Sequence, residues 1–203
     1  LKTVILVLLL PVGYIAGAEA IYFVKSHWSE TLTGWFGIGL GTYAVTYLLL
    51  LRGRLGFAET FEHELAHTVS AVLTFRKVRH FFVHAAEYGE VAVVGRGNLF
   101  IVLAPYFLPI FTTPLLIARP FVTPVFHEYI DFFVGVLLGF SYLRILKETR
   151  PFQPDLQRLG FPFSLLLIFL GNIIILVVIL SILMNDSAAI LNFFKSVYAV
   201  SYT

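Results

Sequence analysis

The segment FSLLLIFLGNIIILVVILSILM, Phe163–Met184, decides the fold class of this chain. It contains no charged residue and has about the 20 residues that an α-helix needs to cross a bilayer. Working outward from it, further apolar stretches of similar length occur at Tyr129–Leu146, Leu99–Ala118, Leu32–Leu51 and Thr3–Val24. We therefore predict an all-α polytopic membrane protein with about five to six transmembrane helices, surrounded by the lipid bilayer.

One of these stretches, Leu99–Ala118, carries three prolines, Pro105, Pro109 and Pro114. Proline removes a backbone donor and clashes with the preceding turn, so we expect this span to be kinked or broken. At the N-terminal end, the run Val4–Phe23 is longer than the core of a signal peptide and shows no clear cleavage site, so we expect a retained helix.

Composition supports a membrane protein and excludes several other classes. The chain has 203 residues, of which 59% are hydrophobic, against roughly 45–50% in soluble domains. A net charge of +2 without a basic block argues against nucleic-acid binding. There is no cysteine, so any metal must be held by nitrogen and oxygen ligands. No repeat or linker divides the chain, and we expect a single domain over residues 1–203.

A polar stretch, Gly53–Asn98, interrupts the apolar pattern between the second and third predicted spans. Residues Phe57–Phe75 show helical periodicity, and two strand-like runs follow at Val78–His84 and Glu90–Val94, with a turn around Ala86–Gly89. This order predicts an amphipathic helix followed by a small β-hairpin.

The predicted helix carries the chemistry, because it contains the motif HELAH at His63–His67. Residues four apart share one face of a helix, so the imidazoles of His63 and His67 can reach one Zn²⁺ ion. Three protein ligands leave a fourth position open for water, whose pKa zinc lowers to about 7. Glu64 lies beside that position and is the predicted general base.

The chain resembles the site-2-protease-like intramembrane zinc metallopeptidases of the M50 and M50B-like families. The features that carry the resemblance are HELAH on a helix, the hairpin directly after it, and the proline-broken span after Asn98. Together they define a metallopeptidase-like core at about residues 55–160. The resemblance implies hydrolysis of peptide bonds in membrane-protein substrates, with the hairpin positioning the unwound substrate strand.

The resemblance also implies a third zinc ligand, an aspartate from a later helix in an L-D-G or N-x-x-P-D-G context. This chain has no such motif, and its aspartates are Asp131, Asp155 and Asp186. With the basic residues Arg52, Arg54, Lys147, Arg150 and Arg158 on the cytoplasmic side, His63 and Asp155 lie toward the same side. We therefore favour Asp155 as the third ligand and keep Asp131 as the alternative. A bacterial inner membrane, with the active site toward the cytoplasm, is the expected location.

Three further polar residues are candidates for contacting the substrate. His80 and His84 share one face of the first predicted strand, and Asn98 follows the hairpin, where its amide could stabilise an oxyanion. Interfacial surface positions for the histidines, and a turn or cap role for Asn98, are the more common alternatives. Glu59 and Glu62, close to the motif, could orient a ligand histidine.

Two functions remain open from the sequence. The first is a membrane-embedded zinc metalloprotease that acts on membrane-protein or peptide substrates, with Glu64 as general base. The second is a catalytically inactive relative that serves as a structural or regulatory subunit of a larger membrane complex, an alternative motivated by the missing L-D-G motif. A transporter is not favoured, because the sequence lacks repeated halves.

Overall fold

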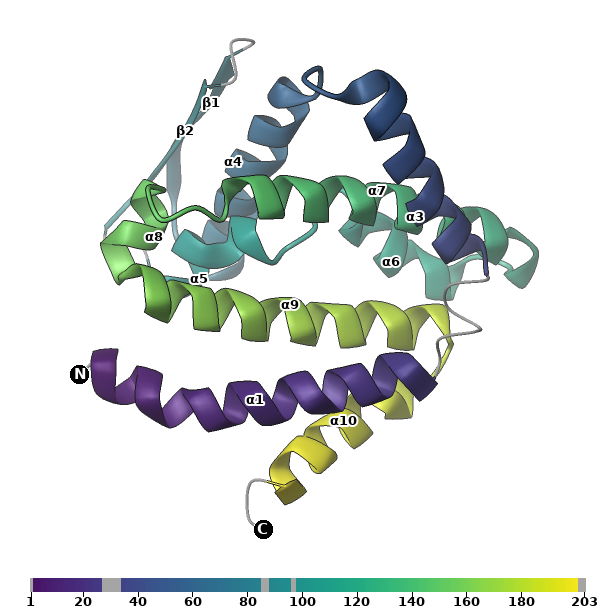
Figure 1. Cartoon of the computed structure of the whole chain (residues 1–203). Coiled ribbons are helices and arrows are strands. Elements are labelled where there is room, and N and C mark those ends of the chain that lie inside the picture. The colour runs from purple at the N-terminus through teal and green to yellow at the C-terminus, as the bar shows by residue number, and fades with distance from the viewer. Residues whose placement is uncertain (1, 27–33, 85–87, 96–97, 201–203) are drawn as a thin grey trace.

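The computed structural model describes residues 2–26, 34–84, 88–95 and 98–200, and it is mostly helical with one small hairpin (Figure 1). Among the described residues, three helical segments are long and apolar enough to cross a membrane. They are α1 (Lys2–Ser26), α7 (His127–Glu148, with the 3₁₀ turn Pro124–Phe126 before it) and α9 (Phe161–Leu183). The predicted polytopic, mostly helical membrane fold with a small hairpin is confirmed.

The other two predicted spans are shorter or interrupted. Trp35–Leu51 is an apolar helix made of α3 (Trp35–Thr46) and a π-helical end (Tyr47–Leu51), and residues 32–33 of that predicted span lie outside the described residues. The proline-rich span is broken as expected. It forms α5 (Leu99–Leu103), a 3₁₀ turn (Ala104–Tyr106), α6 (Thr113–Ala118) and a second 3₁₀ turn (Arg119–Phe121).

Glycines let helices of the bundle pack at short range. A Cβ atom added to Gly39 of α3 would lie 2.0 Å from the carbonyl oxygen of Phe132 in α7. One added to Gly135 of α7 would lie 2.1 Å from the carbonyl oxygen of Phe36. Small residues at such crossings allow the backbone contact that drives helix association in lipid. The two helices therefore form one tightly packed pair.

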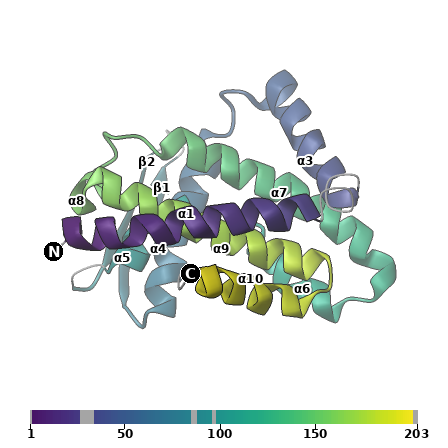
Figure 2. The ribbon, with the colours of Figure 1, turned by 60° about the horizontal axis from the view of Figure 1, so that its bottom comes forward.

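Helix α9 is the centre of the bundle and lies between α7 and α1 (Figure 1). On one side, Ile179 and Leu180 share a buried apolar cluster with Val134 and Leu138 of α7. On the other side, α9 packs against α1 and against α10 (Ser187–Val200), a helix that the sequence reading did not predict. Figure 2 shows the same layering from below, with α1 running across α9. This bundle is the scaffold against which the polar elements are placed.

The polar stretch forms the amphipathic helix and hairpin that were predicted. Helix α4 spans Gly56–Leu73, and strands β1 (Val78–His84) and β2 (Tyr88–Val93) pair antiparallel after it. Part of the predicted turn, residues 86–87, lies outside the described residues. Helix α4 ends where Phe75 adopts a positive φ of 56° and the amide of Arg76 donates to the carbonyl of Ala71. This C-terminal cap turns the chain back along the helix, so the hairpin lies beside α4.

Candidate metal centre

Helix α4 presents His63 and His67 on one face, with ring centroids 4.9 Å apart. The Nδ1 atom of His63 lies 2.7 Å from a carboxylate oxygen of Glu148, and that of His67 lies 2.8 Å from the carbonyl oxygen of Ile101. A carboxylate and a carbonyl can only accept a hydrogen bond, so both Nδ1 atoms donate. In the neutral rings both Nε2 atoms then carry a lone pair that can bind a metal.

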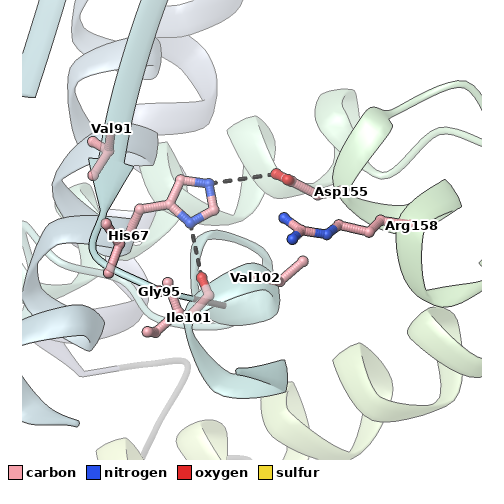
Figure 3. Close-up of a pocket in the computed structure, with 8 residues that line it drawn as sticks. His67, Val91, Gly95, Ile101, Val102, Asp155 and Arg158 are labelled. Atoms are coloured by element: carbon pink, nitrogen blue, oxygen red, sulfur yellow. Dashed lines mark hydrogen bonds and ion pairs between the residues drawn. The ribbon is translucent and has the colours of Figure 1, made fainter. Parts of the chain in front are cut away.

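Asp155 completes the group from helix α8 (Pro154–Leu159), which brings its carboxylate to the two histidines. Figure 3 shows its contact with His67. Its Oδ2 atom lies 3.7 Å from Nε2 of His63 and 3.4 Å from Nε2 of His67. From the sequence, Asp155 was expected on the same side of the membrane as His63, where it could begin the last long helix. In the structure it instead begins a separate short helix, because Gly160, with a φ of 95°, turns the chain between α8 and α9.

The separations among these ligand atoms fit a tetrahedral metal ion. Ligands about 2.0–2.1 Å from zinc at tetrahedral angles are about 3.3–3.4 Å apart. The two distances from Asp155 are close to that value, and all three ligand atoms lie within 4.8 Å of one another. Two imidazoles and a carboxylate form a nitrogen–oxygen donor set that suits zinc. The residues therefore fit a three-ligand metal centre with one open position.

The pKa values of His63, Asp155 and Glu64 are shifted because these groups are partly buried and lie close together. Burial acts to lower the pKa of His63, but its hydrogen bonds to Asp155 and Glu148 outweigh burial and raise that pKa to about 9. Burial acts to raise the pKa of Asp155, yet the two imidazoles hold it well below its usual range. Burial raises the pKa of Glu64 despite the attraction of both histidines. A metal ion and a proton therefore compete for this cluster.

Asp131, the alternative third ligand, lies in a different cluster near the N-terminal end of α7. Both its carboxylate oxygens accept hydrogen bonds from Arg119, at 2.6 and 3.0 Å. Asp131 is not part of the group formed by the two histidines and Asp155. The structure thus brings Asp155, and not Asp131, to the histidines, and the role of Asp155 as a ligand stays a prediction.

Two cavities adjoin the cluster. The larger, of about 450 Å³, is lined by Thr60, His63, Glu64, Tyr88, Gly89, Glu148, Gln153, Pro154 and Asp155. The smaller, of about 170 Å³, is lined by His67, four aliphatic side chains, Gly95, Asp155 and Arg158 (Figure 3). A Cβ atom added to Gly89 of β2 would lie 2.5 Å from Cγ of Glu64. The hairpin therefore closes over the predicted general base, and Glu64 faces the larger cavity.

None of the three predicted substrate contacts lines either cavity. Phe81 of β1 packs edge-on against Phe61 of α4, at 5.8 Å between ring centroids. His80 and His84 are one and three positions from Phe81, so both face the opposite side of the hairpin. The side-chain oxygen of Asn98 accepts a hydrogen bond from the amide of Ile101 and caps α5. Their roles toward a substrate stay predictions.

Sequence reasoning missed the partners of the metal-binding helix on α7. Glu62, proposed as an orienting residue for a histidine, instead pairs with the fully buried Arg144, at 2.9 Å. Glu59 pairs with Lys147, and the residue that contacts His63 is Glu148. An available signal was Arg144, an ionisable residue inside an apolar span, because such residues are costly in lipid and usually have a specific partner.

Comparison with protein families gives one match, to the Peptidase M50B-like family, over residues 38–150. The matched region contains α4 with its HELAH motif, the hairpin, the broken span and α7, and it ends before Asp155. No curated protein matches the chain, and no solved structure matches it. Because the family model covers more than half of a chain that also has membrane-spanning helices, this protein belongs to the Peptidase M50B-like family and is a metallopeptidase-like integral membrane protein.

Proposed function

We propose that this protein is a zinc endopeptidase that hydrolyses peptide bonds of membrane-protein substrates. The observation that carries the proposal is the convergence of His63 and His67 from α4 with Asp155 from α8, beside a cavity that Glu64 lines. The family membership supports it independently. The basic residues on the loops favour the cytoplasmic face of a bacterial inner membrane for this end of the molecule.

The chemistry follows from the positions of these groups. When bound, zinc supplies a Lewis acid at the open position between the three ligands. Glu64 accepts a proton from the attacking water as the new carbon–oxygen bond forms. It then transfers that proton to the peptide nitrogen as the carbon–nitrogen bond breaks, so hydrolysis yields a carboxylic acid and an amine. The raised pKa of Glu64 suits a group that must both accept and release a proton near neutral pH.

A variant of the base tests this proposal. The zinc-loaded protein, reconstituted in liposomes with a panel of single-span membrane proteins, should produce new termini that mass spectrometry detects. Glu64→Gln should abolish that cleavage while zinc content stays stoichiometric, because glutamine keeps the size but cannot accept the proton. The control Glu128→Gln removes an exposed carboxylate from the far end of α7 and should cleave normally. Cleavage by the Glu64→Gln variant would exclude Glu64 as the base.

A second function has one observation in its favour. The family match ends at residue 150, five residues before Asp155, and no L-D-G motif surrounds that aspartate. A catalytically inactive subunit of a larger membrane complex would account for this. That alternative predicts a protein that purifies without zinc, or in a fixed ratio with partner subunits, and that cleaves no member of the panel.

A further inference from the structure

A chain of hydrogen-bonded charged side chains connects α7 to the metal-binding helix. The Nη1 atom of Arg144 donates to Oε2 of Glu148 at 2.8 Å, and the same oxygen accepts from Nδ1 of His63 at 2.7 Å. The Nε atom of Arg144 donates to Glu62 at 2.9 Å, and its Nη2 atom donates to the carbonyl oxygen of Pro105 at 2.8 Å. The guanidinium is therefore held from three directions, with one of them leading to a predicted zinc ligand.

The acceptor Glu62 is itself fixed from two sides. One of its oxygens accepts from the hydroxyl of Ser141 at 2.6 Å and from the amide of Phe111 at 3.2 Å. Glu62 and Arg144 are fully buried. Buried ion pairs add little to stability compared with apolar residues of the same size, because desolvation offsets most of their attraction. The role of this pair is therefore sought in what Arg144 contacts next, the carboxylate of Glu148.

A second ion pair already links the same two helices. Lys147 of α7 pairs with Glu59 of α4 at 2.5 Å, and it contacts no member of the metal-binding group. The helix pair thus has one link that ends at a metal-binding histidine and one that does not. Comparing variants of these two links therefore shows what the contact between Glu148 and His63 contributes to metal binding.

We propose that Glu148 is the positioning residue of the metal centre, which holds His63 with a protonated Nδ1 and directs its Nε2 atom toward the metal. Arg144, anchored by Glu62, keeps the Glu148 carboxylate in place. A carboxylate that accepts from a ligand imidazole fixes the ring and raises its basicity as a ligand. This inference rests on the proposed zinc binding by His63. It assigns a role to three charged residues, the half-buried Glu148 and the fully buried Arg144 and Glu62, that the proposed hydrolysis itself does not use.

Zinc affinity tests the inference without any assay of cleavage. Glu148→Gln should weaken zinc binding by about 10–100-fold, measured by competition with a chelator in detergent. Glu59→Gln is the matched control, because it neutralises the other α4 carboxylate that pairs with α7 and touches no predicted ligand; it should change zinc affinity by less than about twofold. Glu148→Asp, which keeps the charge, should restore part of the loss.

A spectroscopic measurement separates positioning from a general loss of structure. In the Co²⁺-substituted protein, Glu148→Gln should shift the visible d–d bands, since the donor strength of His63 changes, while Glu59→Gln should leave them unchanged. Equal zinc affinity and identical spectra for these two variants would overturn the inference. If the wild-type protein binds no zinc, the proposed function fails as well. If the wild-type protein binds zinc, but Glu148→Gln and Glu59→Gln have the same zinc affinity and the same spectra, the inference alone fails.

Discussion

Two buried arginines pair with carboxylates at opposite ends of α7: Arg119, in a 3₁₀ turn before the helix, and Arg144, within it. They differ in which further residues their partners contact. Arg119 donates to Asp131, to the carbonyl oxygens of Ile182 and Leu183, and to the side chain of Asn185. These contacts join the broken span and α7 to the C-terminal end of α9. None of these partners belongs to the metal-binding group or to the two cavities beside it. The Arg119 cluster is therefore a structural clamp.

The Arg144 cluster differs because its hydrogen bonds lead to side chains that could hold a metal ion. Glu148, which accepts from Arg144, also accepts from His63. Beyond His63 lie the Nε2 atoms of both histidines and the Oδ2 atom of Asp155, which all lie within 4.8 Å of one another. Buried charge by itself therefore does not mark a functional site in this protein. Ligand atoms that converge on a common point and still have lone pairs to offer mark it.

The largest expected effect is on the stability of the clamp. Asp131→Ala should lower the free energy of unfolding by about 3 kcal/mol, because Arg119 stays buried with its counter-charge removed. Unfolding in mixed detergent, followed by the loss of helical circular dichroism, measures this change. Zinc affinity should be unaltered. The control Glu128→Ala, also in the first turns of α7 but exposed, should change stability by less than about 0.5 kcal/mol.

The opposite pattern is expected for the aspartate at the other cluster. Asp155→Ala should weaken zinc binding by at least about 100-fold, because loss of a direct ligand costs more than loss of an outer partner, which costs 10–100-fold. Unfolding of the zinc-free protein should change less than in Asp131→Ala, since the Asp155 side chain is about one-third exposed, at 31%, and solvent screens its attraction to the imidazoles. If Asp131→Ala, and not Asp155→Ala, removed zinc, the assignment of clamp and site would be reversed.

The fold was largely predictable because its signals are local. The apolar runs, the three prolines and the alternation after Lys77 are each read from a short segment, and three long apolar helices, the broken span, the amphipathic helix and the hairpin are all present in the described chain. Helices α8 and α10 were missed as separate elements, since the turn at Gly160 and the amphipathic pattern after Asp186 are weak signals beside the long apolar run of α9.

The site was predictable only in part, for a physical reason. His63, Glu64 and His67 share one helix, so their spacing alone places them together. Glu148 is 85 residues from His63 along the chain, and a single sequence does not show which distant residues come into contact. Asp155 was selected over Asp131 through the side of the membrane expected for each. That argument uses the order in which the spans cross the membrane, so it can relate residues that are far apart in the sequence.

A smaller effect is expected where the hairpin covers the site. Gly89→Ala should lower the rate of peptide cleavage by about tenfold, since the added methyl group would lie 2.5 Å from Cγ and 2.9 Å from Oε1 of Glu64 and must displace the base. Zinc affinity should stay unchanged, because neither histidine is touched. Gly41→Ala is the control, as a Cβ atom there meets nothing within 4 Å. Equal cleavage rates for the two variants would show that Glu64 does not act from this position.

The smallest effect is the pH dependence that only the metal cluster should show. In the metal-free protein the pKa of His63 is raised to about 9, so at neutral pH this ring is protonated and must lose a proton before Nε2 can bind zinc. Below pH 9, zinc affinity should therefore rise tenfold per pH unit, or about threefold between pH 7.0 and 7.5. Chelator competition at the two pH values, corrected for the chelator's own protonation, measures the change. An affinity that is flat across this interval would mean that His63 is already neutral, and its contacts with Glu148 and Asp155 would then not hold a second proton on the ring.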